Sequence, residues 1–372
     1  MNAADPAADH RLMGLALALG RRRLGRTWPN PAVGAVVAGE DGRILGVAAT
    51  APGGRPHAEP VALAMAGEAA RGATLYVSLE PCSHHGRTPP CAEAIVAAGP
   101  TRVVSAIEDA DPRVAGRGHA VLRAAGIVVA TGLRAEEAAI DHRGHLMRVR
   151  VGRPWLTLKL ARTPDGFAGE PGTRLLVTGE AANARTHLMR AHADAVLVGI
   201  GTAASDDPGL DVRLLGLAGR SPVRMVADPR LRLDLAGRLV RTAGERPLWL
   251  LCRQDADPDR ERRLADAGAT VLRCPVRGDG IDLSAALSRL GDFGLTRILC
   301  EGGPVLGEKL AEAGLVDELV LLTGTMPLGR PGLPALGPRL RALASRRPVA
   351  VSFAGGDLVE TFEGTIPCSP AS

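Results

Sequence analysis

The chain has 372 residues, of which 46% are hydrophobic and only 2% aromatic, with a formal net charge of +5. This length exceeds what one hydrophobic core usually supports, so it predicts two domains with mainly aliphatic cores. No apolar run is long enough to cross a bilayer, no signal-like segment follows Met1, and the basic residues are scattered without interleaved aromatic residues, which argues against membrane and nucleic-acid partners.

The first half of the chain alternates helix and strand signals. An apolar stretch over 12–19 ends in Arg21-Arg22-Arg23, which indicates the solvated carboxyl end of a helix. Five strand-like segments and three further helix-like runs follow, and Gly152 and Pro154 then indicate a boundary. The strand-like segments are 32–38, 43–49, 74–79, 102–107 and 127–131, and the helix-like runs are 58–71, 91–98 and 135–148. This alternation predicts an α/β layered domain over residues 1–150.

Three residues of this half have the spacing of a zinc site. His57 and Cys91 each follow a proline at a predicted helix start, and Cys82 lies just past the strand over 74–79. One imidazole and two thiolates hold zinc tetrahedrally and leave the fourth position for water, whose pKa falls to about 7. Glu59, two residues after His57, is placed to carry protons between that water and a departing ammonia. We therefore predict a zinc hydrolase that removes ring amino groups.

Each of these residues alone has an ordinary explanation, because isolated cysteines are commonly small buried hydrophobes and a single His-x-Glu arises by chance. The joint pattern favours the metal. Nucleobase deaminases usually separate the two cysteines by two residues, whereas here the polar, cationic segment 83–90 intervenes. The other cysteines, Cys252, Cys274, Cys300 and Cys368, lack disulfide-like spacing, so we expect a cytoplasmic protein.

The second half again predicts an α/β fold with a parallel sheet. A helix is expected over 180–191, and strands over 155–161, 195–198, 223–227, 248–251, 297–300 and 319–322, with a closing pair over 349–353 and 358–362. Gly302-Gly303-Pro304 follows a strand and opens a helix, so backbone N–H groups can face a cofactor phosphate. Gly199-Ile200-Gly201 lacks the third glycine of a dinucleotide fingerprint, which disfavours a Rossmann fold.

Lys159 alternates with Leu158 and Leu160 in the first strand of this half. Its stem either carries the ammonium out of the sheet to solvent or aims it into a cleft, and the sequence leaves both readings open. In a cleft, Lys159 would donate the proton that opens a ribose ring, after which the exposed C1 imine would accept hydride from nicotinamide.

The stretch 80–91, which reads EPCSHHGRTPPC, and Trp28-Pro29-Asn30-Pro31 upstream closely resemble the bifunctional riboflavin-biosynthesis deaminase/reductase family. The resemblance covers nearly the whole chain. It implies a cytidine-deaminase-like α/β/α domain, then a dihydrofolate-reductase-like α/β domain over 151–372, with Zn²⁺ and NADPH as cofactors. The implied reactions are zinc-dependent hydrolytic deamination of 2,5-diamino-6-(5-phosphoribosylamino)pyrimidin-4(3H)-one and reduction of the ribosyl chain of 5-amino-6-(5-phosphoribosylamino)uracil to ribityl.

The resemblance also implies site residues. Asn30 would hold the pyrimidine, and the loop 83–87 would approach the phosphoribosyl arm. The residues implied to face NADPH are Ala161, Leu176, Thr202, Asp206, Pro229, Gly303, Pro304, Val305, Leu306, Gly307, Glu308 and Lys309. Those implied to face the reductase substrate are Arg174, Arg190, Leu210, Arg213 and Glu301. Arg190 and Arg213 suit a phosphate clamp, because guanidinium is always charged and donates two parallel hydrogen bonds.

The sequence departs from the family pattern at several positions. Thr50 stands where the family has a histidine before His-Ala-Glu, and Arg174 and Leu176 stand in place of the family's serine and tryptophan. These reductase departures keep open an alternative, a monofunctional zinc deaminase whose second domain only binds nucleotide or supports oligomerisation. A nucleic-acid deaminase is the other alternative and would show strongly salt-dependent binding. We expect a homo-oligomer, a dimer or a tetramer, acting on a small phosphorylated pyrimidine.

Overall fold

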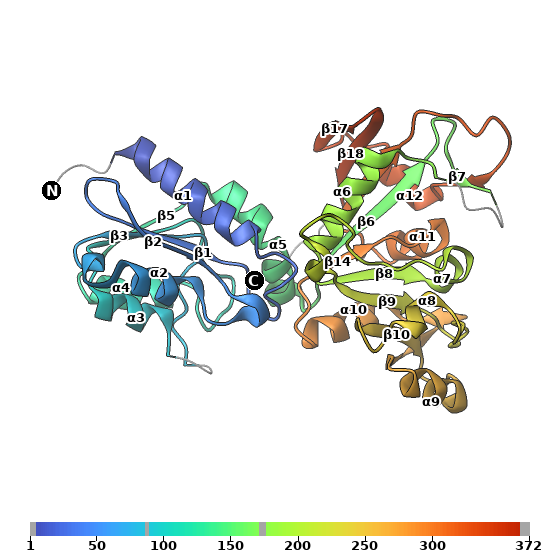
Figure 1. The fold of residues 1–372 in the computed structure, drawn as a ribbon, viewed down its shortest axis with the longest axis horizontal. Helices are drawn as coiled ribbons and strands as arrows, with labels where there is room; N and C mark the ends of the chain where they lie inside the picture. Colours follow the sequence, from blue (N-terminus) through green and yellow to red (C-terminus); the bar gives the residue numbers. More distant parts are fainter. Residues whose placement is uncertain (1–4, 86–88, 171–175, 365–372) are drawn as a thin grey trace. The chain divides into compact units, whose positions relative to one another are not determined.

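The computed structural model describes residues 5–85, 89–170 and 176–364, and the chain divides into two compact units, Met1–Arg153 and Pro154–Ser372 (Figure 1). Within these described ranges every helix is too short or too polar to span a bilayer. The cysteines at 82, 91, 252, 274 and 300 are all free, and Cys368 lies outside the described residues.

The amino-terminal unit is built on one five-stranded sheet in the order β2-β1-β3-β4-β5. Strands β3, β4 and β5 are parallel, and β1 is antiparallel to both β2 and β3. The strands are β1 (Gly34–Ala38), β2 (Ile44–Ala49), β3 (Thr74–Val77), β4 (Arg102–Ser105) and β5 (Val128–Thr131). The helices are α1 (Pro6–Arg21), α2 (Ala58–Ala66), α3 (Cys91–Ala98), α4 (Arg117–Ala124) and α5 (Ala135–Val151), with 3₁₀ turns at Pro52–Gly54 and Gly67–Ala70.

Side-chain alternation along these strands creates two apolar faces, as a period of two requires. Ala35, Val37 and Leu75 pack with residues of α2, α3 and α4, whereas Val36 and Tyr76 pack with residues of α1 and α5. The unit is therefore a three-layer α/β/α sandwich, as predicted.

The carboxy-terminal unit is built on a nine-stranded sheet in the order β11-β10-β9-β8-β14-β6-β15-β18-β17. Neighbouring strands are parallel from β11 to β15, and the closing pair β18 and β17 is antiparallel. The main strands are β6 (Trp155–Arg162), β8 (Ala195–Gly199), β9 (Val223–Ala227), β10 (Leu248–Arg253), β11 (Thr270–Cys274), β14 (Arg297–Cys300), β15 (Glu318–Thr323), β17 (Ala350–Ala354) and β18 (Asp357–Glu363). Two small ribbons pair β7 (Phe167–Gly169) with β16 (Leu333–Pro334), and β12 (Val276–Arg277) with β13 (Gly280–Ile281).

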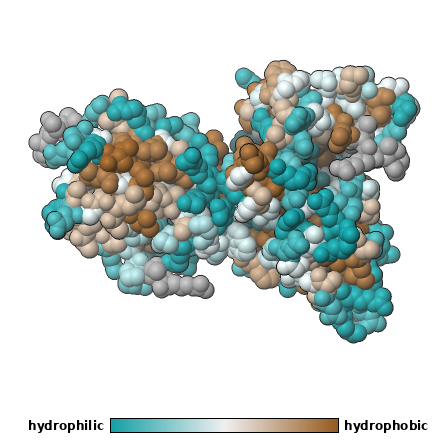
Figure 2. Space-filling model, viewed as in Figure 1, coloured by the Kyte–Doolittle hydropathy of each residue, from teal (hydrophilic) through white to brown (hydrophobic). Residues whose placement is uncertain are grey.

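The helices of this unit are α6 (Glu180–Ala191), α7 (Ile200–Asp206), α8 (Arg238–Arg241), α9 (Pro258–Asp266), α10 (Leu283–Asp292), α11 (Pro304–Glu312) and α12 (Pro338–Ala344), with a 3₁₀ turn at Ala218–Arg220. Buried aliphatic residues of β8, β9, β10 and the flanking helices form a core of this unit. Helix α9 is rich in charged residues, and its outer surface is hydrophilic in Figure 2.

Two of the predicted elements differ from the observed ones in extent. The helical run predicted over 58–71 is divided at Gly67, whose φ of 56° and ψ of −136° are not helical, and continues as a 3₁₀ turn. The strand predicted over 74–79 ends at Val77, because Ser78 hydrogen-bonds to Gly34 through both its backbone and its hydroxyl as the chain leaves the sheet.

Candidate active sites

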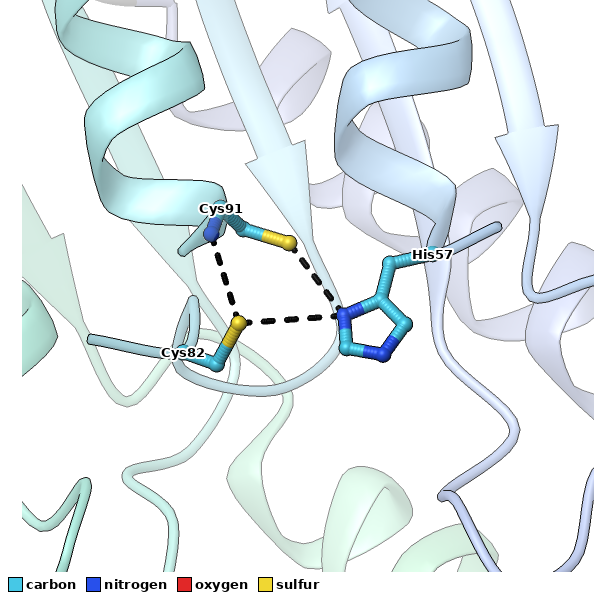
Figure 3. Close-up of side chains that lie close together, drawn as sticks. All are labelled: His57, Cys82 and Cys91. Atoms are coloured by element: carbon cyan, nitrogen blue, oxygen red, sulfur yellow. Dashed lines mark hydrogen bonds between the residues drawn. The ribbon is translucent and has the colours of Figure 1, made fainter. Parts of the chain in front are cut away.

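The three predicted zinc ligands lie together in the amino-terminal unit. His57 is the residue before α2, Cys91 is the first residue of α3, and Cys82 lies in the loop between β3 and α3. His57 Nδ1 lies 3.3 Å from Cys91 Sγ and 3.7 Å from Cys82 Sγ, and Figure 3 shows this nitrogen facing both sulfurs. The Cys91 N–H donates to Cys82 Sγ at 3.3 Å. Two helix starts and one loop thus bring the three ligand atoms to one point.

This donor set fits zinc. The ligand atoms of His57, Cys82 and Cys91 all lie within 4.8 Å of one another, and two sulfurs with one imidazole nitrogen are typical zinc ligands. A hydrogen bond from Cys91 and then one from His57 lower the pKa of Cys82 to about 4, although burial opposes them, so this sulfur is a thiolate at neutral pH. Three protein ligands leave a fourth tetrahedral position for water or substrate.

Glu59 lies beside this cluster in the first turn of α2. It is only 3% exposed, and its Oε2 has no hydrogen-bond partner among the described residues. Burial raises the pKa of Glu59, while the charge of His57 opposes the rise. A buried carboxylate oxygen without a partner costs stability, so its position beside the metal ligands indicates a chemical task.

His57, Cys82 and Glu59 line a cavity of about 390 Å³. Asn30 also lines it, and its side-chain amide donates to the carbonyl of Gly54 at 2.8 Å. Thr50, which stands in place of the family's histidine, is 1% exposed in the wall, and its hydroxyl accepts from the N–H of Val33. Of the loop predicted to approach the phosphoribosyl arm, His84 lies in the wall, and residues 86 and 87 lie outside the described residues.

Sequence reasoning missed several charged residues of this wall. They are Arg55, Glu80, Asp109, Asp111, Arg113, His145 and Arg148. Asp109 and Arg113 follow β4, and His145 lies on α5, so only the folded chain brings them to the metal ligands. One sequence signal could have identified part of this set. Acidic residues and a proline cluster just past the strand predicted over 102–107, where functional loops commonly lie.

A second cavity, of about 1480 Å³, lies in the carboxy-terminal unit. Strands β6, β8, β9 and β14 end at it, as ligand sites of parallel sheets usually require. The N–H of Gly303 donates to the Thr202 hydroxyl at 3.1 Å, and α11 begins at the next residue. This volume exceeds the roughly 300–1,000 Å³ of common small-molecule sites, so it suits an extended cofactor and a substrate together.

Many predicted reductase residues line this cavity, and others do not. Those in the wall are Lys159, Ala161, Leu176, Thr202, Asp206, Pro229, Glu301, Gly303, Pro304, Val305, Leu306 and Lys309. Outside it lie Gly307, Glu308, Arg190, Leu210 and Arg213. Gly307 packs close to Leu158 and Leu340, Glu308 accepts hydrogen bonds at the start of α12, and Leu210 belongs to the main core. Arg174 lies outside the described residues.

Lys159 faces the cavity rather than solvent, which resolves the two readings of its sequence position. Burial lowers the pKa of Lys159, and the negative charge of Glu301 partly opposes that effect. Glu301 accepts two hydrogen bonds from Arg190, at 2.6 and 2.8 Å, which hold its pKa below the usual value although burial acts in the other direction. A lysine with a lowered pKa, in a cavity that also holds a carboxylate fixed by an arginine, is typical of catalytic sites.

The two arginines of the predicted phosphate clamp are engaged with protein groups. Arg190 is buried, and its remaining amino group donates to the carbonyl of Asp211 at 2.9 Å. Arg213 donates to the Asp211 carboxylate at 2.7 Å. Sequence reasoning missed three other basic residues that do line the cavity, Arg230, Arg232 and Arg277. The first two flank Leu231 directly after β9, a position at a strand end that could have identified them.

Comparisons with known proteins match both units of the chain. Residues 6–107 match the family model "Cytidine and deoxycytidylate deaminase zinc-binding region", and residues 154–346 match "RibD C-terminal domain". The riboflavin biosynthesis protein RibD of Escherichia coli (strain K12) is 40% identical over 333 residues, which cover 86% of this chain and 89% of that protein.

Two solved structures are similar over almost the whole chain. Acinetobacter baumannii RibD, form 1, has a TM-score of 0.86 at 32% identity and covers 97% of this chain and 100% of its own. A diaminohydroxyphosphoribosylaminopyrimidine deaminase/5-amino-6-(5-phosphoribosylamino)uracil reductase from Thermotoga maritima has a TM-score of 0.83 at 28% identity and covers 96% and 99%. The chain therefore belongs to the RibD family of riboflavin-biosynthesis proteins, and it is a bifunctional enzyme with a zinc-dependent deaminase and an NADPH-dependent reductase.

Proposed function

We propose that the chain hydrolyses the 2-amino group of 2,5-diamino-6-(5-phosphoribosylamino)pyrimidin-4(3H)-one and then reduces the ribosyl chain of 5-amino-6-(5-phosphoribosylamino)uracil. The observation that carries this proposal is the convergence of His57, Cys82 and Cys91 beside the buried carboxylate of Glu59. The two activities for which the Thermotoga maritima protein is named support the choice of substrates. We assign deamination to residues 1–150 and reduction to residues 151–372.

In the deaminase half, His57, Cys82 and Cys91 would hold the zinc. Zinc bound there supplies a Lewis acid that lowers the pKa of water to about 7. Glu59 accepts the proton of the attacking water and delivers it to the departing ammonia, because its carboxylate lies in the same cavity wall as His57 and Cys82. Asn30 holds the pyrimidine in the same cavity.

In the reductase half, the segment from Gly303 to Leu306 and the residues Ala161, Thr202 and Asp206 surround the cofactor. NADPH bound there supplies the hydride that reduces the opened sugar chain at C1. Lys159 donates the proton that opens the ribose ring, and Glu301 places a negative charge near the Lys159 amine. The start of α11 binds a cofactor phosphate, since its backbone N–H groups donate hydrogen bonds and the helix dipole favours an anion.

One reaction tests both halves. With the diaminopyrimidine and NADPH, we expect ammonia and NADP⁺ to form in equal amounts from protein that contains about one zinc per chain. Removal of the metal with a chelator should abolish ammonia release but not the reduction of added deaminated substrate. Ammonia release without NADPH oxidation would contradict the proposed reduction of the deaminated product.

Arg230 and Arg232 offer the exposed cations that a phosphate on the cofactor's ribose requires. We expect Arg230→Ala/Arg232→Ala to raise the KM for NADPH by about 10- to 100-fold and the KM for NADH hardly at all, as the loss of charge-assisted hydrogen bonds predicts. Steady-state kinetics with both cofactors measures this, with Arg263→Ala on α9, outside the cavity, as the control. Equal rises for the two cofactors would contradict the assignment.

The remaining proposals concern partners and location. Exposed Val351 and Phe353 lie on β17, an edge strand of the nine-stranded sheet, and support a homo-oligomer, a dimer or a tetramer, formed through this edge. The volume of about 390 Å³ suits a small phosphorylated pyrimidine better than a nucleic acid. The free thiols of the described cysteines support a cytoplasmic location.

A further inference from the structure

One hydrogen-bonded pair in the wall of the deaminase cavity has no part in the scheme above. His145, on α5, places its Nε2 2.9 Å from Oδ1 of Asp109, in the segment after β4. Both side chains line the cavity and are only 9% and 10% exposed. A carboxylate buried to this extent is costly unless its oxygens are engaged.

Asp109 is fixed from two further directions. The N–H of Asp111 donates to the same Oδ1 at 2.9 Å, and the N–H of Asp109 donates to Oε2 of Glu80 at 3.2 Å. Glu80 is buried and lies two residues before the zinc ligand Cys82. It also accepts from the N–H groups of Gly116 and Gly118. The position of Asp109 is therefore tied to the loop that carries the metal ligand.

The second carboxylate oxygen of Asp109, Oδ2, indicates that this cavity binds a hydrogen-bond donor. Burial raises the pKa of Asp109, but the hydrogen bond and charge of His145 outweigh it, so the group stays an anion. Within the described residues no hydrogen bond reaches its Oδ2, and the nearby Arg113 is engaged with Asp111 instead. Nδ1 of His145 is buried without a partner. An ionised carboxylate oxygen can accept hydrogen bonds but cannot donate them, so Oδ2 suits an N–H or O–H donor of a bound molecule.

We propose that His145 is a positioning residue of the deaminase, which holds the Asp109 carboxylate so that Oδ2 accepts a hydrogen bond from a donor group of the pyrimidine substrate. The proposal rests on the proposed deamination and adds a recognition element to it. His145 donates through Nε2 to Oδ1 at 2.9 Å, and this hydrogen bond restrains the orientation of the carboxylate. Because the pair acts on binding geometry rather than on proton transfer, its loss affects KM more than kcat.

The test compares donors of different reach at position 145. A glutamine amide nitrogen reaches the position of Nε2, whereas an asparagine amide is too short and phenylalanine has no donor. We expect His145→Phe and His145→Asn to raise the KM for deamination about 10-fold with kcat changed less than about threefold, and His145→Gln to stay near wild type. Zinc content and reductase activity, measured on the same samples, should not change.

His142 provides the matched control. It lies on the same helix, is 2% exposed, and places its Nε2 3.1 Å from the hydroxyl of Ser78, which is not in the cavity wall. His142→Phe should lower thermal stability without raising KM. Asp109→Asn should itself raise KM, and adding His145→Phe to it should have little further effect.

Three results would overturn the proposal. The first is a wild-type KM in both His145→Phe and His145→Asn, and the second is a rise of KM in His142→Phe as large as that in His145→Phe. The third is a KM of the Asp109→Asn/His145→Phe variant that equals the product of the two single effects. Should the phenylalanine variant not fold, the comparison of asparagine with glutamine carries the same test. If the wild-type protein releases no ammonia, the deamination itself fails, which is a different outcome from a wild-type enzyme unaffected by these changes.

Discussion

Glu59→Gln should reduce deamination by about 10²- to 10⁴-fold at near-normal zinc content, the loss expected when a general acid/base is removed. Glutamine has almost the same volume and fits the same buried position in the first turn of α2, but it cannot accept and return a proton. The three metal ligands are untouched by the change, because Glu59 is not one of them. Ammonia release measured beside the zinc content of the same sample separates the two effects.

Glu68→Gln provides the control for that experiment. Glu68 follows the same helix at the start of the 3₁₀ turn and is exposed, so the change removes the same charge outside the cavity. Its deamination should match the wild type. Ammonia release by Glu59→Gln at the wild-type rate would remove the proton-carrying role, and loss of zinc from that variant would mean that Glu59 supports the metal instead.

The metal site could be predicted from the sequence because its ligands lie at element boundaries. His57 precedes α2, Cys91 begins α3, and the prolines before both are local signals of a helix start. The recognition residues of the same cavity could not be predicted this way. Asp109 and His145 come from a loop and from the middle of a helix, and only the packing of α5 and that loop in the folded unit places them together.

The elements of the fold also divide into those with a strong local sequence signal and those without one. Strands with continuous apolar runs, such as β8 and β14, were predicted within one residue, because burial on both faces leaves a strong sequence signal. Strand β11, with an alternating exposed and buried pattern, and the charged helix α9 were not predicted, although Asp257 and Pro258 form a standard helix start. The pairing of Arg190 with Glu301 could not be predicted from the sequence either, since the two residues are 111 positions apart.

Lys159→Met should lower the rate of reduction by about 10²-fold or more and leave ammonia release at the wild-type rate. Methionine keeps the length and the apolar stem of lysine in β6 but has no proton to donate. The fold should tolerate the change, since burial already disfavours the charged form of Lys159. NADPH oxidation with the deaminated pyrimidine as substrate measures the loss, and deamination by the same sample serves as the internal control.

Lys159→Arg separates proton donation from simple charge. Arginine keeps a cation near Glu301 but does not release a proton at any ordinary pH, so it should be as inactive as methionine if Lys159 acts as an acid. Substantial reduction by the arginine variant would show that Lys159 only balances charge. Wild-type reduction by Lys159→Met would remove Lys159 from the mechanism, and the proton would then have to come from another group of the cavity wall.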